Sequence, residues 1–482
     1  MNHWPRICSR SSGRYVLLTG AWWLQHVGPT ETGKPLQFKA GRPLASYVVL
    51  NRIDLRGRNG DELVAELPRP DPGGEGPTEA VRAILAEVRA GGDSAVRSLT
   101  EKFDGVNIAD SRVGREALLE ALASIPSELA DALTEAAEAV RTFHVAQLRD
   151  EHTVVRGGIS VTGRSVPVDR AGCYVPGGRG VYPSSVLMTV IPARVAGVPE
   201  IVLCVPPDRG TGKIAPATLA AAAIAGADEV RAIGGAQAIA AMAYGTETLR
   251  PVDVIAGPGN AFVALAKREV AGLVGVPMAF AGPSEIVVIA DKTAPADFVA
   301  IDLMVQAEHG PDGLAWLVTW DETVADAVDA ALVRLVAEAP RRSEIESTFA
   351  SGGFCALVDS PEAAIAVVNH IAAEHVEIIT DDAARLSAGV RHAGAVFLGP
   401  LAPASIGDYV AGPSHVLPTF GTARFGSALT VDDFTKQVHV VEVTRAGFDA
   451  AAPVVAAIAD AEGFATHAES VRLRTRALEA ES

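Results

Sequence analysis

The feature that most constrains the fold is a regular alternation of short β-rich apolar runs with alanine-rich helical stretches, which begins near residue 184. The first runs are Glu200–Val205, Glu229–Ile233, Val252–Ala256, Glu285–Ala290 and Leu314–Thr319. Further runs follow at Phe354–Val358, Val376–Thr380 and Ala395–Leu398. Strands that alternate with helices predict βαβ units and parallel sheet. Since these are more strands than one ordinary sheet needs, we expect two doubly wound α/β domains.

The chain before residue 184 carries signals of helices and of a hairpin. Residues Pro68–Pro77 (PRPDPGGEGP) have the composition of a linker, and apolar residues then recur at helical spacing from Val81 to Val88. A second helix is indicated by apolar residues between Leu129 and Phe143. The segment Thr153–Val168 is punctuated by glycine and rich in β-branched residues, which predicts a hairpin.

The first 48 residues differ from the rest of the chain. They hold three of the five tryptophans and show neither helical nor alternating periodicity. A run at Tyr15–Leu24 resembles a signal peptide only faintly, because no small-x-small cleavage site follows it. We interpret residues 1–48 as an N-terminal extension, either a disordered arm or the product of an upstream start site. We expect their deletion to leave folding and activity unchanged.

The net charge and the cysteine content indicate which partners the protein can bind and in which cellular compartment it is expected. The formal net charge of −17 argues against nucleic acid and anionic membranes, which would repel an acidic surface. No run of about 18 apolar residues lacks breakers or charges, so no transmembrane helix is predicted. The four cysteines are widely spaced, which indicates neither a disulfide scaffold nor a Cys-type zinc site and favours the cytoplasm.

Glycine clusters mark the expected ligand crevice. The dinucleotide fingerprint G-x-G-x-x-G with an acidic residue about 20 positions on is absent. Three clusters instead follow expected strand ends, at Tyr174-Val-Pro-Gly-Gly, Gly234-Gly-Ala-Gln237 and Gly257-Pro-Gly-Asn260. Open α/β sheets bind ligands at strand carboxyl ends. Each cluster alone could merely allow a tight turn, but three together favour a crevice.

Several polar residues could carry chemistry. Gln306 and His309 are three apart at an expected helix end, so they share one face and could grip a metal ion. Asp408 and His467 offer the carboxylate oxygen and imidazole nitrogen that zinc accepts. A polar surface pair is the plainer interpretation of Gln306 and His309 taken alone.

Glu374 and His375 are candidate proton acceptors for the oxidation of an alcohol. They precede an expected strand, in which successive side chains point in opposite directions. A shared role therefore requires the backbone to turn between them, and an unrelated surface pair is the alternative.

From about Leu50 to its C-terminus the chain resembles the histidinol dehydrogenase family. The resemblance rests on ordered motifs: Cys173-Tyr-Val-Pro-Gly-Gly, Ile233-Gly-Gly-Ala-Gln-Ala-Ile-Ala-Ala-Met-Ala, Ile255-Ala-Gly-Pro-Gly-Asn-Ala-Phe-Val, Ala281-Gly-Pro-Ser-Glu, Gln306-Ala-Glu-His-Gly-Pro-Asp, Ala373-Glu-His, Gly407-Asp-Tyr and Ser414-His-Val-Leu-Pro-Thr. It implies NAD-dependent, four-electron oxidation of L-histidinol to L-histidine through a bound aldehyde, in the last steps of histidine biosynthesis.

The resemblance also implies roles for individual residues. One zinc ion per subunit would be bound by Gln306, His309, Asp408 and His467, with Glu374 and His375 as the catalytic pair. NAD would lie beside Tyr174, Gln237 and Asn260. The residues facing the substrate would be Ser284, Gln306, His309, His375, Asp408, His415, Glu462 and His467.

The resemblance further implies two doubly wound, incomplete Rossmann-like domains with small N- and C-terminal dimerisation segments. Residues 49–173 with 284–427 would form the first domain, which holds the metal and catalytic residues. Residues 174–283 would form the NAD side. Residues 428–482 would be a helical tail that crosses to the partner of a homodimer, so that each active site is shared.

Two other enzyme classes remain open on the residues alone. Another zinc-dependent, NAD-linked amino-alcohol dehydrogenase would need the same residues, and a zinc hydrolase could use them to activate water. A nucleophilic role for Cys173 is disfavoured because no activating His or Lys is evident near it in sequence, so we expect a small buried side chain.

Overall fold

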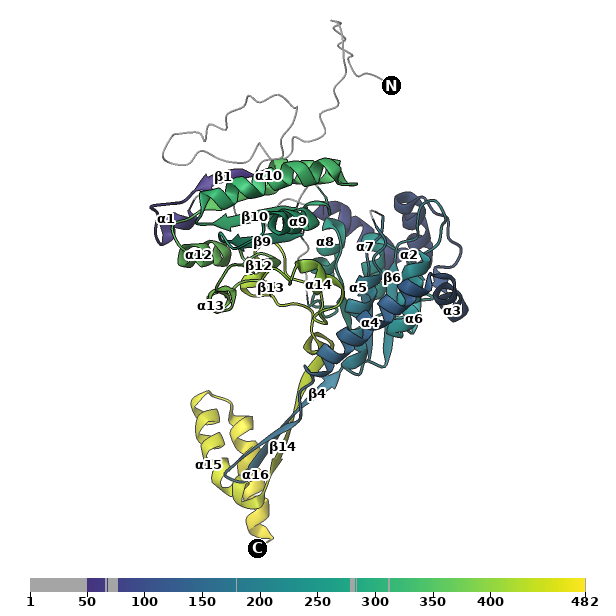
Figure 1. Ribbon diagram of the computed structural model, residues 1–482. Helices are drawn as coiled ribbons and strands as arrows, with labels where there is room; N and C mark the ends of the chain where they lie inside the picture. Colours follow the sequence, from purple (N-terminus) through teal and green to yellow (C-terminus); the bar gives the residue numbers. More distant parts are fainter. Residues whose placement is uncertain are drawn as a thin grey trace, which may run out of the picture. The chain divides into compact units, whose positions relative to one another are not determined.

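The computed structural model describes residues 50–65, 67, 77–178, 180–277, 282, 284–310 and 313–481. The expectations for the extension 1–48 and for most of the linker therefore lie outside the described residues. Two sheets that are wholly or mainly parallel, each covered by helices on both faces, form the larger part of this region (Figure 1). This confirms the doubly wound α/β class.

The first sheet has six parallel strands in the order β1-β11-β10-β9-β12-β13. Its strands are β1 (Asn51–Asp54), β9 (Glu285–Ala290), β10 (Leu314–Thr319), β11 (Gly353–Leu357), β12 (His375–Ile379) and β13 (Ala395–Leu398). Its helices are α1 (Asp61–Val64), α9 (Ala296–Ala307), α10 (Glu322–Glu338), α11 (Arg342–Gly352), α12 (Pro361–Ile371), α13 (Ala383–Ser387) and α14 (Ala404–Tyr409).

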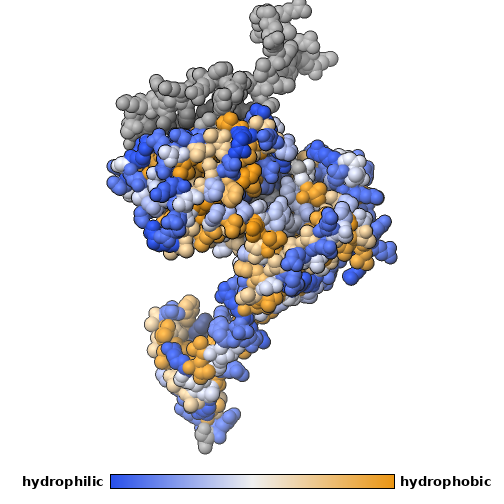
Figure 2. All heavy atoms as spheres, viewed as in Figure 1, coloured by the Kyte–Doolittle hydropathy of each residue, from blue (hydrophilic) through white to orange (hydrophobic). Residues whose placement is uncertain are grey.

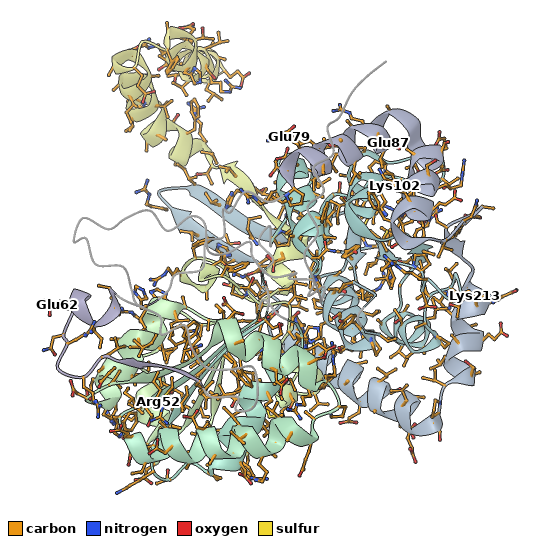
Figure 3. All side chains as sticks on the ribbon, turned by 90° about the horizontal axis from the view of Figure 1, so that it is seen from above. Arg52, Glu62, Glu79, Glu87, Lys102 and Lys213 are labelled. Carbon is orange, nitrogen blue, oxygen red and sulfur yellow. The ribbon has the colours of Figure 1, made fainter. Side chains whose placement is uncertain are left out.

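The central strand β9 explains the continuous apolar runs in the sequence. Ile286 and Val288 pack in one core with α9 and α10, whereas Val287 and Ile289 pack in a second core with α1 and α12. A strand buried on both faces needs apolar residues at every position. At the edge, Arg52 of β1, labelled in Figure 3, pairs with Asp326 and Asp329 of α10 at 2.7 and 2.6 Å.

The second sheet has five strands in the order β2-β7-β6-β5-β8, parallel except for the short β2. Its strands are β2 (Arg112–Val113), β5 (Arg170–Tyr174), β6 (Glu200–Val205), β7 (Glu229–Ala232) and β8 (Val254–Ala256). Its helices are α2 (Thr78–Asp104), α3 (Arg115–Ser124), α4 (Ser127–Val145), α5 (Pro183–Val195), α6 (Pro216–Ala225), α7 (Gly235–Tyr244) and α8 (Ala261–Val270).

The elements between residues 78 and 174 differ in placement from the expectation. Residues 49–173 were assigned to the sheet that bears the catalytic residues, but α2 packs in one core with α7 and α8. Helices α3 and α4 share another core with α5 and α6, and β5 is a central strand of the five-stranded sheet. An amphipathic pattern indicates that a helix has a buried face but not which sheet covers it.

A third, antiparallel sheet of three strands has the order β14-β4-β3. It consists of β3 (His152–Arg156), β4 (Ile159–Pro167) and β14 (Thr435–Val443), and it continues into α15 (Arg445–Ala461) and α16 (Ala465–Ala480). We call these five elements the C-terminal arm. The expected hairpin is β3 and β4, whereas the expected wholly helical tail begins with the strand β14.

Helices α15 and α16 pack on each other around a small core of Ala456, Ala459 and Ala468, separate from the cores of the two larger sheets. Large apolar side chains stay exposed on both helices, among them Val454, Ile458 and Leu473. Figure 2 shows apolar residues on the surface of this helix pair. The arm therefore presents an apolar face that its own chain leaves uncovered.

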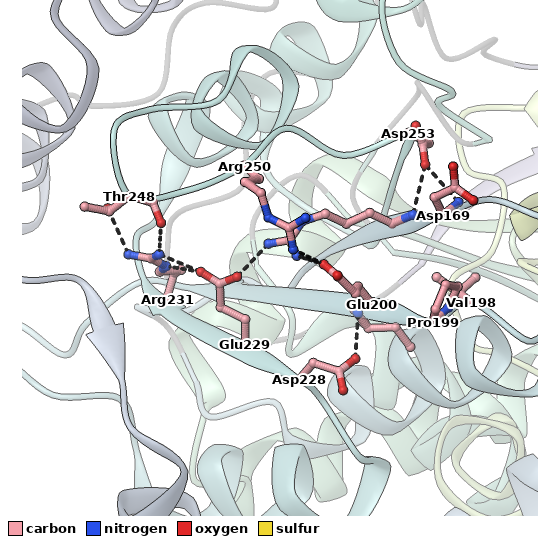
Figure 4. Close-up of polar contacts among 12 residues, drawn as sticks. Asp169, Val198, Pro199, Glu200, Asp228, Glu229, Arg231, Thr248, Arg250 and Asp253 are labelled. Carbon is pink, nitrogen blue, oxygen red and sulfur yellow. Dashed lines mark hydrogen bonds and ion pairs between the residues drawn. The ribbon is translucent and has the colours of Figure 1, made fainter.

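Charged residues at the amino ends of β5, β6 and β7 pair with one another (Figure 4). Arg170 contacts Glu200 at 2.5 Å and Glu229 at 2.6 Å, and Glu229 also binds Arg231 at 2.6 Å. Arg250 pairs with Glu200. We call these five residues the paired network. Across all the residues described, no helix is both long and apolar enough to cross a membrane.

Candidate active site

Glu374 and His375 converge at the amino end of β12. His375 is the first residue of the strand, and Glu374 directly precedes it. Glu374 Oε2 lies 3.6 Å from His375 Nδ1. The two side chains therefore meet, although the left-handed residue of this segment is Ala372, which ends α12, and not a residue between them.

Glu285, which the sequence analysis did not single out, lies between the two side chains. It is the first residue of β9, which pairs with β12 so that Ile286 lies opposite His375. Its backbone N–H donates to Glu374 Oε2 at 3.1 Å, and its carbonyl oxygen accepts from His375 Nδ1 at 3.1 Å. Its own carboxylate is 1% exposed, and neither oxygen has a hydrogen-bond partner. The only sequence signal was a charged residue at the start of an otherwise apolar strand.

Asp408 and His415 complete the polar cluster. Asp408 lies on α14, and its Oδ1 is 3.3 Å from His375 Nε2. His415 Nδ1 donates to the backbone carbonyl of Asp408 at 2.9 Å, and its Nε2 lies 3.0 Å from Ser185 Oγ. Because both ring nitrogens of His375 face oxygen atoms, the arrangement favours the doubly protonated ring.

Burial and neighbouring charge set the protonation states in this cluster. Burial opposes the charged form of His375, but the charge of Glu374 and the bond to Asp408 outweigh it and raise its pKa to about 9. Burial raises the pKa of Glu374 to about 7. Burial and the charge of Glu374 raise the pKa of Glu285 to about 8. Groups that titrate near neutral pH suit acid–base chemistry.

Gln306 lies in the last turn of α9 and His309 just beyond its end. The Gln306 side chain is 1% exposed, and neither its amide nitrogen nor its amide oxygen has a partner. His309 lies near enough to Asp408 to help lower that carboxyl's pKa, together with the stronger hydrogen bond from His375 that overcomes burial. Gln306, His309 and Asp408 thus offer an orphaned amide, an imidazole and a carboxylate.

The remaining candidate ligand, His467, lies on α16 together with its ring neighbour Phe464, 5.3 Å away between ring centroids. Glu462, at the end of α15, and His467 are both exposed. Within the part of the chain that the structure describes, no three His, Cys, Asp or Glu side chains gather closely enough to hold a metal ion. The described chain alone therefore supplies an incomplete set of ligands.

The glycine clusters follow the carboxyl ends of β5, β7 and β8, as expected. The Tyr174 hydroxyl accepts a hydrogen bond from the Gly235 N–H at 3.0 Å, and the Gln237 side chain is buried. Asn260 caps α8 by accepting from the Val263 N–H at 3.1 Å. Tyr174 and Asn260 therefore also hold the backbone at the start of α7 and α8 in place.

A cleft joins the loop after β8 to the catalytic cluster. It is lined by Gly257, Pro258, Gly259, Lys267, Gly282, Ser284, Glu374, His415, Val416, Leu417 and Thr419. Lys267 was not anticipated: it is 1% exposed, and its ammonium donates to the Gly257 carbonyl oxygen at 2.8 Å. Burial lowers its pKa to about 8. A lysine on the apolar face of a helix was its only sequence signal.

Cys173 is buried within the strand β5, as expected for a small apolar side chain. Burial raises the pKa of its thiol to about 12, so the thiolate is scarce at neutral pH. The structure thus disfavours a nucleophilic cysteine at this position.

Comparisons with known proteins agree on one family. A family model described as histidinol dehydrogenase matches residues 69–475. The histidinol dehydrogenase of Bacillus subtilis strain 168 is 46% identical over 407 residues, 84% of this chain and 95% of the relative. That of Thermobifida fusca strain YX is 46% identical over 432 residues, 88% of this chain and 98% of the relative. The crystal structure of histidinol dehydrogenase from Elizabethkingia anophelis superimposes with a TM-score of 0.85 at 33% identity, covering 90% of this chain and 100% of that one.

Proposed function

The chain belongs to the histidinol dehydrogenase family, and we propose that the cluster around Glu374 and His375 carries out that family's reaction. The enzyme is an NAD-dependent oxidoreductase of histidine biosynthesis that oxidises L-histidinol to L-histidine through bound L-histidinaldehyde. The observation that carries the site assignment is the convergence of Glu374, His375 and Asp408 beside the cleft.

Glu374 and His375 handle the protons of both oxidations. Each oxidation removes a hydride from carbon and a proton from the neighbouring hydroxyl, so each needs a base within hydrogen-bond reach. The chemistry that NAD supplies when bound is acceptance of a hydride, twice for each substrate. With pKa values of about 7 and about 9, the two groups hold and release a proton near neutral pH. Glu285 fixes both side chains through its backbone.

Tyr174, Gln237 and Asn260 bind NAD at the carboxyl ends of the five-stranded sheet. The cleft supports this proposal because it runs from the loop Gly257-Pro258-Gly259 to Glu374. Ser284 and His415 line the same cleft and face the substrate. The six-stranded sheet thus supplies the catalytic side, and the five-stranded sheet supplies the NAD side.

Gln306, His309 and Asp408, with His467 of the partner subunit, would hold the zinc ion. The orphaned amide of Gln306 and the ionised carboxyl of Asp408 fit such an ion, since zinc accepts oxygen and imidazole donors in four-coordinate sites. The chemistry that zinc supplies when bound is redox-silent orientation of a substrate hydroxyl and imidazole. Gln306, His309, His375 and Asp408 would therefore also contact the substrate.

We infer that the working unit is a homodimer with shared active sites. His467 and Glu462 lie where α15 passes into α16 on the C-terminal arm, and the core of this helix pair is separate from the cores of the two larger sheets. The exposed apolar residues of α15 and α16 support an association that buries them. A two-fold exchange of arms would bring His467 and Glu462 of the partner subunit to each site. We also propose the cytoplasm as the compartment, because the three described cysteines are free thiols.

Subunit mixing tests the shared site. His467→Ala and His309→Ala subunits are each expected to be inactive. After exchange, one site of a mixed dimer collects both defects and the other collects none, so activity should return towards about a quarter of wild type if pairing is random. Exchange shown by differently tagged subunits, without any return of activity, would refute the shared site.

The reaction itself is tested with purified protein, NAD and L-histidinol. Two NADH should form for each L-histidinol consumed, and L-histidine should be the product. A single NADH with release of an aldehyde would instead indicate another amino-alcohol dehydrogenase. Turnover of an ester or amide without NAD would indicate a zinc hydrolase.

A further inference from the structure

Two buried carboxyl groups, Asp302 and Glu377, lie beneath the catalytic cluster and take no part in the mechanism above. Glu377 is in the middle of β12 and is 1% exposed, and Asp302 is on α9 and is 7% exposed. Buried carboxyl groups are costly unless they are paired or hydrogen-bonded. Their placement therefore calls for a physical reason.

Glu377 holds the amino end of α14. Its Oε1 accepts a hydrogen bond from the N–H of Ala404, the first residue of that helix, at 2.6 Å. Asp408 follows on the same helix, four residues later. Its Oδ1 meets His375, which is two residues before Glu377 on β12. The helix α14 thus contacts β12 twice, through the Ala404–Glu377 hydrogen bond and through the Asp408–His375 contact in the catalytic cluster.

The spacing of these two contacts matches. Four residues of helix rise about 6 Å, and two residues of strand span about 6.6 Å. Side chains two apart on a strand also face the same side, so His375 and Glu377 both point towards α14. Asp302 and Gln306 are likewise four apart on α9 and share one face. Each of the three elements therefore contributes one residue to the level of the catalytic cluster, which we call the upper level: Gln306, His375 and Asp408. Each also contributes one residue to a second level about 6 Å away, which we call the lower level: Asp302, Glu377 and Ala404.

The two lower carboxyl groups, Asp302 and Glu377, interact with each other. Glu377 Oε2 has no donor beside it among the described residues, and the side chain that bonds with Glu377 is the carboxyl of Asp302. Two carboxyl groups hydrogen-bond only when one of them is protonated. Burial and the neighbouring charge raise the pKa of Glu377 to about 9, and burial raises that of Asp302, so one shared proton is retained at neutral pH.

We propose that Asp302 and Glu377 are positioning residues, a carboxyl pair that locks α14 to α9 and so sets Asp408 at the spacing from Gln306 and His309 at which a metal ion binds. The inference rests on the proposed function, because it takes these three residues as the metal ligands. Groups that orient metal ligands from behind typically contribute 10–100-fold to metal affinity.

Three substitutions separate positioning from general stability. Glu377→Gln keeps both bonds, because its amide oxygen accepts from Ala404 and its NH₂ donates to Asp302. Glu377→Leu has similar bulk and loses both. Asp329→Leu is the matched control: it removes a buried carboxylate of the same sheet region that binds the Leu50 N–H and Arg52, away from α9's last turn and α14.

The measurements are the zinc dissociation constant of the purified dimer, by competition with a chromogenic chelator, and the melting temperature of the metal-free protein. Glu377→Leu should bind zinc 10–100-fold more weakly, Glu377→Gln within about threefold of wild type, and Asp329→Leu as wild type although it melts earlier. If Glu377→Leu does not fold, Asp302→Leu gives the same comparison, since it removes the link to α9 and leaves the cap on α14.

Wild-type zinc affinity in Glu377→Leu or Asp302→Leu would overturn the positioning role and leave the proposed function standing. Equal losses of affinity in Glu377→Gln and Glu377→Leu would also overturn it, because the amide preserves both bonds. A wild-type protein that binds no zinc, or a His309→Ala variant that still binds it stoichiometrically, would overturn the ligand assignment and the positioning role together.

Discussion

Buried charged residues lie at the amino ends of the strands in both larger sheets, but they are paired in one sheet and partly unpaired in the other. In the five-stranded sheet, Arg170 lies between Glu200 and Glu229, and Arg231 binds Glu229 again. In the six-stranded sheet, Glu285 and Glu374 begin or precede neighbouring strands, yet both oxygens of the Glu285 carboxylate lack partners. Charged residues at the amino ends of the strands thus stabilise the five-stranded sheet, whereas in the six-stranded sheet they belong to the proposed active site.

The pairing of the carboxylates distinguishes the two regions: Glu200 and Glu229 each bind an arginine, although Arg170 Nε has no partner, whereas the Glu285 carboxylate has none. A buried charged group that is already fully hydrogen-bonded has no free donor or acceptor for a ligand. A buried group without a partner can form a new hydrogen bond when a ligand binds. The catalytic cluster therefore accepts a cost in stability that the paired network avoids. Substitutions in the two regions should separate stability from function.

The largest effect is expected at the metal ligands. His309→Ala or Asp408→Asn should lower both bound zinc and turnover to background, because three remaining ligands do not make a closed tetrahedral set. Metal content by elemental analysis and NADH formation check this together. Stoichiometric zinc in either variant would remove that residue from the ligand set.

At the catalytic pair, His375→Asn should lower kcat by about 10²–10⁴-fold, which is the usual worth of a general base. The melting temperature should fall as well, because Glu374 and Asp408 lose their buried partner, so kcat is compared under conditions where the variant is folded. His392→Asn, on the surface between α13 and β13, is the matched control. A variant with normal kcat and a raised KM would show that His375 binds rather than reacts.

The paired network should show the opposite behaviour. Arg170→Met should destabilise the fold by roughly 3 kcal/mol, the low end for breaking a buried pair, because Glu229 keeps Arg231. Arg250→Met breaks an ion pair whose arginine is 70% exposed and should cost under about 1 kcal/mol. Denaturant unfolding measures both. A loss of kcat/KM in the folded Arg170→Met enzyme would contradict the division between the two regions.

Lys267 gives the most graded effect, because it is buried on the cleft side and its ammonium donates to a backbone carbonyl. Its pKa of about 8 lies below the value of about 10.4 for an unfolded lysine. The unfolded chain therefore binds more protons between these values, and stability rises with pH across this window. Relative to Lys267→Met, the wild type should gain roughly 3 kcal/mol between pH 8 and 10.4. A constant difference would mean that Lys267 keeps an ordinary lysine pKa and stays charged when buried across this window.

The sequence allowed most strands to be located and several to be bounded to the residue. β6, β9, β10 and β13 begin and end where expected. The first three are buried on both faces and leave continuous apolar runs, whereas β13 is a partly exposed edge strand. The strand β14 was missed, since its solvent-facing residues interrupt the apolar pattern. The sheet on which α2 to α4 pack depends on long-range contacts that no local pattern records.

For the site, patterns and family resemblance predicted residues but not the atoms that hold them. Helix α12 ends at Ala372 in a left-handed conformation that alanine seldom adopts, so the sequence did not signal where Glu374 and His375 leave the helix. Glu285, Lys267 and the pair Asp302 and Glu377 are single charged residues within apolar elements. Their partners lie far away along the chain, so only folding reveals them.

The strand pairing of the C-terminal arm has a consequence for biosynthesis. Thr444 binds the carbonyl of Gly158, 286 residues earlier in the chain, and β14 runs along the whole of β4. At 5–20 residues per second, the ribosome needs roughly 15–60 seconds to deliver that partner. Throughout this interval one edge of β4 is open to strands of other nascent chains. The last segment to be translated is thus the one that closes this edge, and a truncated product would leave it permanently available for aggregation.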